Sequence, residues 1–136
     1  NFDDLQSEKE YKTMQVYGRS KLANILFTRE LAERLEGKGV TVNCLHPGFV
    51  NTGIGSNNSP TLGRILMALA RPFSRKTDKG AETSIYLCVS PEVENETGEY
   101  FYDCKKEKIS AAASDKENAT LLWEVSSKLT GIDLLD

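Results

Sequence analysis

The fold class is decided by the run VTVNCLHPG, residues 40–48. Its first seven residues are largely apolar or β-branched, and Pro47-Gly48 ends any regular element there. Before this run, residues 15–35 place apolar side chains at helical intervals, and Gly37 and Gly39 supply a helix-ending signal. A nearly continuous apolar strand directly after a helix favours a parallel sheet with both faces covered. The sequence therefore predicts an α/β fold.

The rest of the chain continues this alternation. We expect a loop over 48–60, helices over 62–73, 77–89 and 114–128, and a strand over 99–103. Thr77 or Asp78 is expected to cap the second of these helices, and Ser114 with Glu117 has capping-box spacing. The result is about two strands and about four helices. Two strands cannot complete a doubly wound sheet, and residue 1 is not Met, so we expect the missing half to lie upstream.

Composition excludes several classes of function. The net charge of -3 argues against a nucleic-acid surface, where a basic stripe is expected. The three cysteines are odd in number and widely spaced, which predicts neither a metal site nor a disulfide framework and favours a reducing, intracellular compartment. No apolar run approaches the roughly 20 residues that span a bilayer, and the acidic start NFDD is no signal peptide. We therefore expect no anchor in these residues.

One pair of side chains has the spacing of an acid–base unit. Tyr17 and Lys21 are four residues apart in the expected helix over 15–35, so they share one helix face. A neighbouring ammonium favours the phenolate, as proton transfer near neutral pH requires. The spacing alone is a weak signal, because i,i+4 neighbours occur on any helix. Tyr102 and Lys106 repeat it at the end of a strand followed by a charged loop, and we interpret that pair as structural.

A Pro-Gly turn follows the first expected strand. In open α/β sheets ligands bind at the carboxyl ends of strands, and Pro47-Gly48 stands at such an end. Glycine allows backbone to approach a ligand closely, and Thr52 adds a hydroxyl donor. The alternative interpretation is a plain strand-ending turn. For His46 we expect backbone partners rather than proton transfer.

Together the Y-x-x-x-K helix, the strand and the Pro-Gly-x-Val-x-Thr turn resemble the short-chain dehydrogenase/reductase family. SKLANILFT at 20–28, GAETS at 80–84 and LWEVS at 122–126 resemble its retinol dehydrogenase branch. The resemblance implies that residues 1–136 form the C-terminal half of a single domain of this family. Its fold would be the C-terminal part of a Rossmann-like doubly wound parallel sheet, incomplete without the N-terminal half.

The resemblance also implies roles. Tyr17 would exchange a proton with the substrate oxygen, and Lys21 would assist it and bond the nicotinamide ribose. The cofactor would be NADP(H) rather than NAD(H), and the substrate a retinoid or another hydrophobic aldehyde or alcohol. The implied carboxamide contacts are backbone at Pro47, Gly48 and Val50, together with Thr52.

The family's glycine-rich phosphate turn, Asn-Asn-Ala-Gly segment and catalytic serine all precede the tyrosine, and nothing here matches them. The chain alone is therefore expected to bind dinucleotide poorly and to be inactive. The alternative is a non-catalytic truncated isoform that binds a partner protein. A nucleotide-sugar epimerase shares Y-x-x-x-K but fits the later motifs less well.

Two surfaces could serve the whole protein. The basic amphipathic stretch 62–76 is either a membrane-surface contact or a solvated helix. The resemblance implies a homodimer interface on the Tyr17 helix. It also implies association of the full-length parent with the endoplasmic reticulum or mitochondrial membrane.

Overall fold

The computed structural model describes residues 2–50, 72 and 74–132. This part of the chain does not include Thr52. Apart from residue 72, it also does not include the expected helix over 62–73. The elements are η1 (Phe2–Asp4), α1 (Thr13–Arg34), β1 (Cys44–Leu45), α3 (Thr77–Val89), η3 (Pro91–Val93), β2 (Tyr100–Tyr102), β3 (Lys105–Lys106), η4 (Ala111–Ala113) and α4 (Lys116–Thr130). Helices and strands alternate as far as β2, which confirms the α/β class.

The three strands form one mixed sheet in the order β1-β2-β3. β1 and β2 are parallel, with Cys44 opposite Tyr100 and Leu45 opposite Phe101, as predicted. β3 pairs antiparallel with β2, and this strand corrects the expectation of an all-parallel sheet. The turn between them has positive φ at Asp103 and at the residue after it, as a tight type I′ hairpin requires.

The first strand is shorter than the predicted run over 40–46. The Val42 carbonyl accepts the Gly98 N–H (2.7 Å), while the Val42 N–H donates to Thr97 Oγ1 (3.0 Å). Asn43 uses its side-chain amide to bond the backbone of Glu96 and Glu99. The segment before β1 is therefore held beside the sheet by one backbone bond and by bonds of the Thr97 and Asn43 side chains.

The helix ends differ from the sequence prediction in their capping residues. Asp115, not Ser114, caps α4, because its carboxylate accepts the N–H of Asn118 at 3.0 Å. Ser114 instead donates its hydroxyl to carbonyls of η4. Gly131 ends α4 at φ 68°, the left-handed conformation that glycine adopts easily. At α3 the prediction was wrong, since Lys76 holds the cap position and makes no side-chain cap bond.

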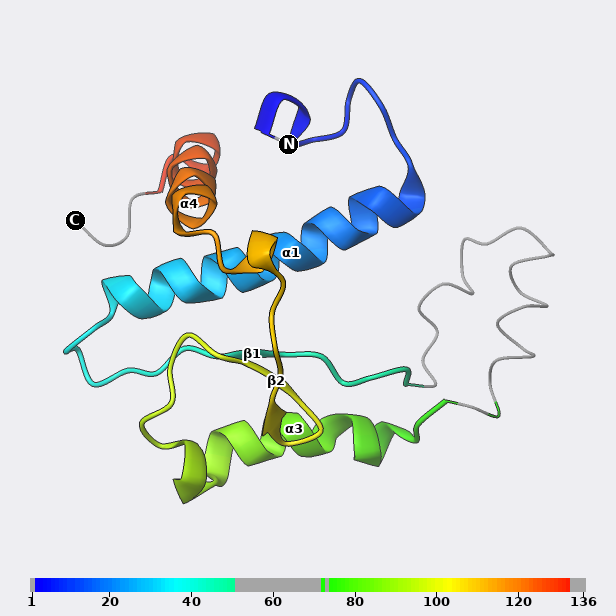
Figure 1. Ribbon diagram of the computed structural model, residues 1–136, viewed down its shortest axis with the longest axis vertical. Coiled ribbons are helices and arrows are strands. Elements are labelled where there is room, and N and C mark those ends of the chain that lie inside the picture. Colours follow the sequence, from blue (N-terminus) through cyan, green and yellow to red (C-terminus); the bar gives the residue numbers. More distant parts are fainter. Residues whose placement is uncertain (1, 51–71, 73, 133–136) are drawn as a thin grey trace.

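Helices lie on both sides of the strands, α1 and α4 on one side and α3 on the other (Figure 1). The apolar core between α1 and α4 consists of Leu26, Ala119 and Leu122. Trp123 stacks on Phe27 beside this core, with centroids 5.6 Å apart, so it packs as expected. On the α3 side Phe101 is only 1% exposed. No helix in the described residues is long and apolar enough to cross a membrane.

Candidate functional site

Tyr17 and Lys21 lie together on α1. The Lys21 ammonium sits 5.3 Å from the centroid of the Tyr17 ring, within the range of a cation–π contact. Tyr17 is 55% exposed, so its phenol is open to a ligand. The helical spacing has therefore brought the two groups to one face, as predicted. Their catalytic roles stay a prediction.

The helix that carries Tyr17 and Lys21 packs beside the first strand of the sheet. α1 contacts β1 directly. Burial raises the pKa of Tyr100, with smaller contributions from the charges of Cys44, Glu107 and Tyr17. The ring of Tyr100 lies 5.7 Å from that of His46, the residue that follows β1. The helix that carries the acid–base pair therefore packs against the strand that leads into the Pro-Gly turn.

The Pro-Gly turn is built around His46. The His46 N–H donates to Phe101 O at 3.1 Å, which continues the β1–β2 pairing by one bond. The Gly48 N–H then donates to His46 Nδ1 at 3.1 Å. The histidine therefore has backbone partners, as expected. Gly48 itself has φ 79°, a conformation that favours glycine.

Gly48 is also needed for space. A Cβ added there would lie 3.2 Å from Arg75 Nε and 3.3 Å from Tyr102 Cε2. Two side chains from distant parts of the chain therefore pack on the Gly48 backbone. Neither was identified from the sequence as part of the site.

Val50 is fixed by a second close approach. It forms an isolated parallel bridge with Arg75, whose N–H donates to Phe49 O at 2.7 Å. A Cβ added at Gly80 in α3 would lie 2.6 Å from Val50 Cγ2. Gly80, from the GAETS motif, thus leaves room for Val50. Pro47 is exposed beside these residues, and Thr52 is outside the described part of the chain.

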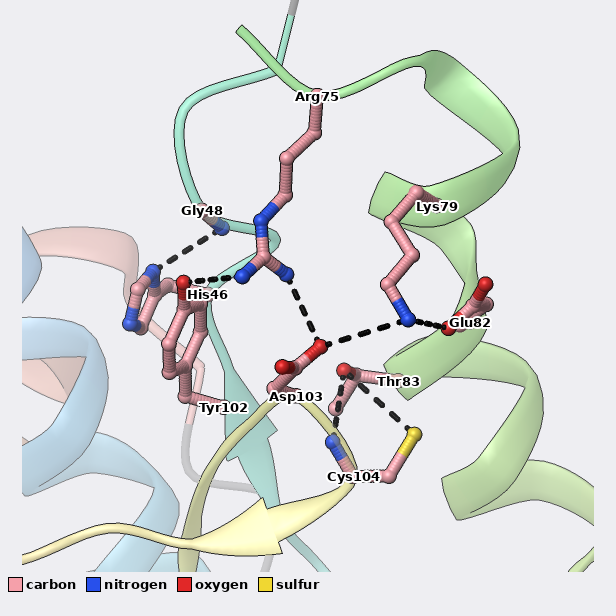
Figure 2. Close-up of polar contacts among 9 residues, drawn as sticks. All are labelled: His46, Gly48, Arg75, Lys79, Glu82, Thr83, Tyr102, Asp103 and Cys104. Atoms are coloured by element: carbon pink, nitrogen blue, oxygen red, sulfur yellow. Dashed lines mark hydrogen bonds and ion pairs between the residues drawn. The ribbon is translucent and has the colours of Figure 1, made fainter. Parts of the chain in front are cut away.

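We call His46, Gly48, Arg75, Tyr102 and Asp103 the strand-end cluster (Figure 2). The Tyr102 ring stacks on His46 at 4.2 Å with an interplanar angle of 3°. The Arg75 guanidinium lies 4.8 Å from the Tyr102 centroid and donates to the Tyr102 hydroxyl. It also forms an ion pair with Asp103, at 3.0 Å. The cluster joins the end of β1, the start of α3 and the β2–β3 turn.

The charges in this cluster support one another. The hydrogen bond from Arg75 holds the pKa of Asp103 below its ordinary value, and the pKa of Arg75 is raised chiefly by the same bond. Lys79 is a second cation at Asp103, at 3.8 Å, and pairs more closely with Glu82. Among the described residues no group of three or more His, Cys, Asp or Glu side chains is arranged to hold a metal.

One sequence signal could have identified Asp103. It comes directly after β2, and the carboxyl ends of parallel strands are where α/β proteins collect functional side chains. Arg75 carried no such signal, because its partner is 28 residues away. Tyr102 and Lys106 were correctly interpreted as lacking helical geometry, although Lys106 lies in β3 rather than in a loop.

Three features of this structure point to one class of protein. They are a parallel strand pair, helices on both of its sides, and a Tyr–Lys helix beside the strand that leads into the Pro-Gly turn. A family model described as short chain dehydrogenase matches residues 5–63. The chain belongs to the short-chain dehydrogenase/reductase family.

Similarity to individual proteins extends over nearly the whole chain. The chain is 52% identical to retinol dehydrogenase 14 of Mus musculus over 134 residues, which is 97% of this chain and 40% of that relative. The same identity and coverage hold for retinol dehydrogenase 14 of Homo sapiens. Retinol dehydrogenase 12 of Mus musculus is 46% identical over 96% of this chain and 41% of its own length. The chain thus spans about 40% of the length of the curated relatives it matches.

Proposed function

We propose that this chain is the C-terminal half of one short-chain dehydrogenase/reductase domain. The whole protein would be an NADP(H)-dependent oxidoreductase that interconverts retinol and retinal, or other hydrophobic alcohols and aldehydes. The observation that carries the proposal is the Lys21 ammonium over the Tyr17 ring, on the helix packed beside the strand that ends in Pro47-Gly48. The names of the similar proteins support the retinoid substrate.

The residues present fit a nicotinamide group. Pro47 is exposed at the turn, and Tyr17 on the neighbouring helix is 55% exposed, so both are open to a ligand. Backbone at Pro47, Gly48 and Val50 would hold the carboxamide, with Thr52 as a further donor. The family resemblance favours NADP(H) over NAD(H).

Each residue of the acid–base pair has a distinct task. The Tyr17 hydroxyl gives its proton to the carbonyl oxygen during reduction and recovers it during oxidation. Lys21 stabilises the phenolate that remains and would donate to the ribose hydroxyls of a bound cofactor. The bound nicotinamide supplies or accepts the hydride. A general acid of this kind contributes roughly 10²- to 10⁴-fold to the rate.

The test uses the whole protein with retinal and NADPH. Tyr17→Phe keeps the ring under the Lys21 ammonium but removes the transferable proton, so we expect turnover to fall at least about 100-fold while NADPH binding changes little. Tyr11→Phe is the matched control, because Tyr11 is an exposed tyrosine that precedes α1. Lys21→Ala should weaken cofactor binding as well as turnover.

Substantial turnover in Tyr17→Phe would remove the assigned role. A wild-type protein that neither binds NADPH or NADH nor reduces retinal or other hydrophobic aldehydes would refute the enzyme and favour the non-catalytic interaction protein. Kinetic selection of NADH over NADPH would correct the cofactor alone. Membrane association of the whole protein stays a prediction from the resemblance.

A further inference from the structure

The chain leaves the end of β1 and returns to the same place. Val50 and Arg75 form a parallel bridge, and the Arg75 N–H donates to Phe49 O at 2.7 Å. Arg75 therefore adjoins the Pro-Gly turn through its backbone before its side chain makes any contact. Two residues later α3 begins at Thr77.

The Arg75 side chain also packs against the turn, at Gly48. Its Nε and Cδ atoms lie 3.2 and 3.3 Å from where a Gly48 Cβ would be. The guanidinium continues past Gly48 to the Tyr102 hydroxyl and to Asp103 Oδ1. Since the arginine fork is planar and rigid, two acceptors fix its orientation better than one.

A second route connects the same groups to the turn. Tyr102 stacks flat on His46, and His46 Nδ1 accepts the Gly48 N–H. Arg75 thus acts on Gly48 twice, by direct packing and through the ring pair. An exposed ion pair is ordinarily worth little, and the Arg75 and Asp103 side chains are 26% and 45% exposed. The geometry is therefore better suited to fixing a conformation than to stabilising the fold.

We propose that Arg75 is a positioning residue, which through Asp103 and Tyr102 fixes the backbone of the Pro47-Gly48 turn for binding the nicotinamide end of the cofactor. This inference rests on the proposed function. Arg75 is not a catalytic residue, because it acts on the turn and not on the reacting atoms. Its loss should weaken cofactor binding selectively.

Lys79 provides a matched control. It is also a cation paired with Asp103, at 3.8 Å, but its main partner is Glu82 in the same helix. The three atoms nearest to an added Gly48 Cβ belong to Arg75 and Tyr102, and none belongs to Lys79. Removing Lys79 therefore changes the local charge by the same amount without removing a contact to the turn.

The experiment measures NADPH dissociation constants by fluorescence titration of the whole protein, together with KM for NADPH, KM for retinal and the melting temperature. For Arg75→Ala we expect the NADPH dissociation constant and KM to rise about tenfold. KM for retinal should stay within about twofold, and Lys79→Ala should resemble wild type. Arg75→Lys keeps the charge but cannot bond both acceptors in one plane, so it should lie between wild type and Arg75→Ala.

Arg75→Lys carries the test if Arg75→Ala does not fold, and cofactor affinity equal to wild type in Arg75→Lys would then overturn the proposal. Unchanged NADPH affinity in a folded Arg75→Ala protein would overturn it directly. Parallel losses in melting temperature and in both KM values would show a general structural role and would also overturn it. If wild type binds neither NADPH nor NADH, the proposed function itself fails, and this inference falls with it.

Discussion

The α1–α4 interface has an apolar core, whereas the strand-end cluster is polar and aromatic. Leu26, Ala119 and Leu122 in the interface are buried and apolar, so their contribution follows from surface removed from water. No member of the strand-end cluster is buried, and its contacts are ring stacking, hydrogen bonds and an ion pair. Apolar contacts are non-directional, whereas polar and stacking contacts fix angles. We infer that the first region supplies stability and that the second supplies geometry.

One polar group in the interface is an exception to this contrast. The Glu30 side chain is only 7% exposed, yet it accepts from Arg34 Nε at 2.8 Å and from Thr120 Oγ1 at 3.0 Å. Thr120 belongs to α4, so the carboxylate joins the two helices at one point. Because both carboxylate oxygens have donors, no acceptor is left unsatisfied at this buried position.

The largest effect is expected at Leu122. Leu122→Ala removes a side chain that is 8% exposed and packs with Leu26, and the free energy of unfolding should fall by about 2–5 kcal/mol. Leu121→Ala is the control, because Leu121 is 40% exposed. Chemical denaturation of both variants measures the difference. Equal losses would break the comparison, since stability would then not come from the buried face.

The second effect is expected at Gly80, where stability and site geometry meet. Gly80→Ala places a methyl group 2.6 Å from Val50 Cγ2, and Val50 must move. We expect a loss of about 1–3 kcal/mol of unfolding free energy and weaker NADPH binding. Gly18→Ala is the control, because a Cβ there meets nothing within 4 Å and alanine favours a helix. Thermal melts and cofactor titrations test this prediction. Equal melting temperatures and equal NADPH affinities in the two variants would contradict it.

These two regions also differ in how far the sequence predicts them. Apolar periodicity identified α1, helix start and stop signals identified α3 and α4, and β2 was found from three consecutive aromatic residues. β3 was missed, because two exposed lysines carry no strand pattern and the hairpin turn lacks glycine.

The site shows the same division. Tyr17 and Lys21 are neighbours on one helix, so spacing alone brings them together. Arg75 meets Asp103 only because α3 starts beside the β2–β3 turn, and that proximity is a property of the tertiary fold. Local patterns therefore predict the acid–base pair and not the residues that support the turn.

The smallest effect is expected from the charge of Asp103. Because the bond from Arg75 lowers the pKa of this carboxyl below its ordinary 3.8, the folded protein favours the ionised form. Its stabilising effect is fully present above about pH 4 and is lost as pH falls through the lowered folded-state pKa. Asp103→Asn should therefore melt slightly below wild type at pH 7, with the gap closing on acidification.

Melting curves from pH 7 to pH 3 test this prediction, and the same substitution in an Arg75→Ala background is the control. In that background the gap should be smaller at every pH, because the main cause of the shift is absent. A gap that widened in acid, or one as large as that of Leu122→Ala, would mean that the strand-end ion pair stabilises the fold. The division between a stabilising interface and a geometry-fixing cluster would then not hold.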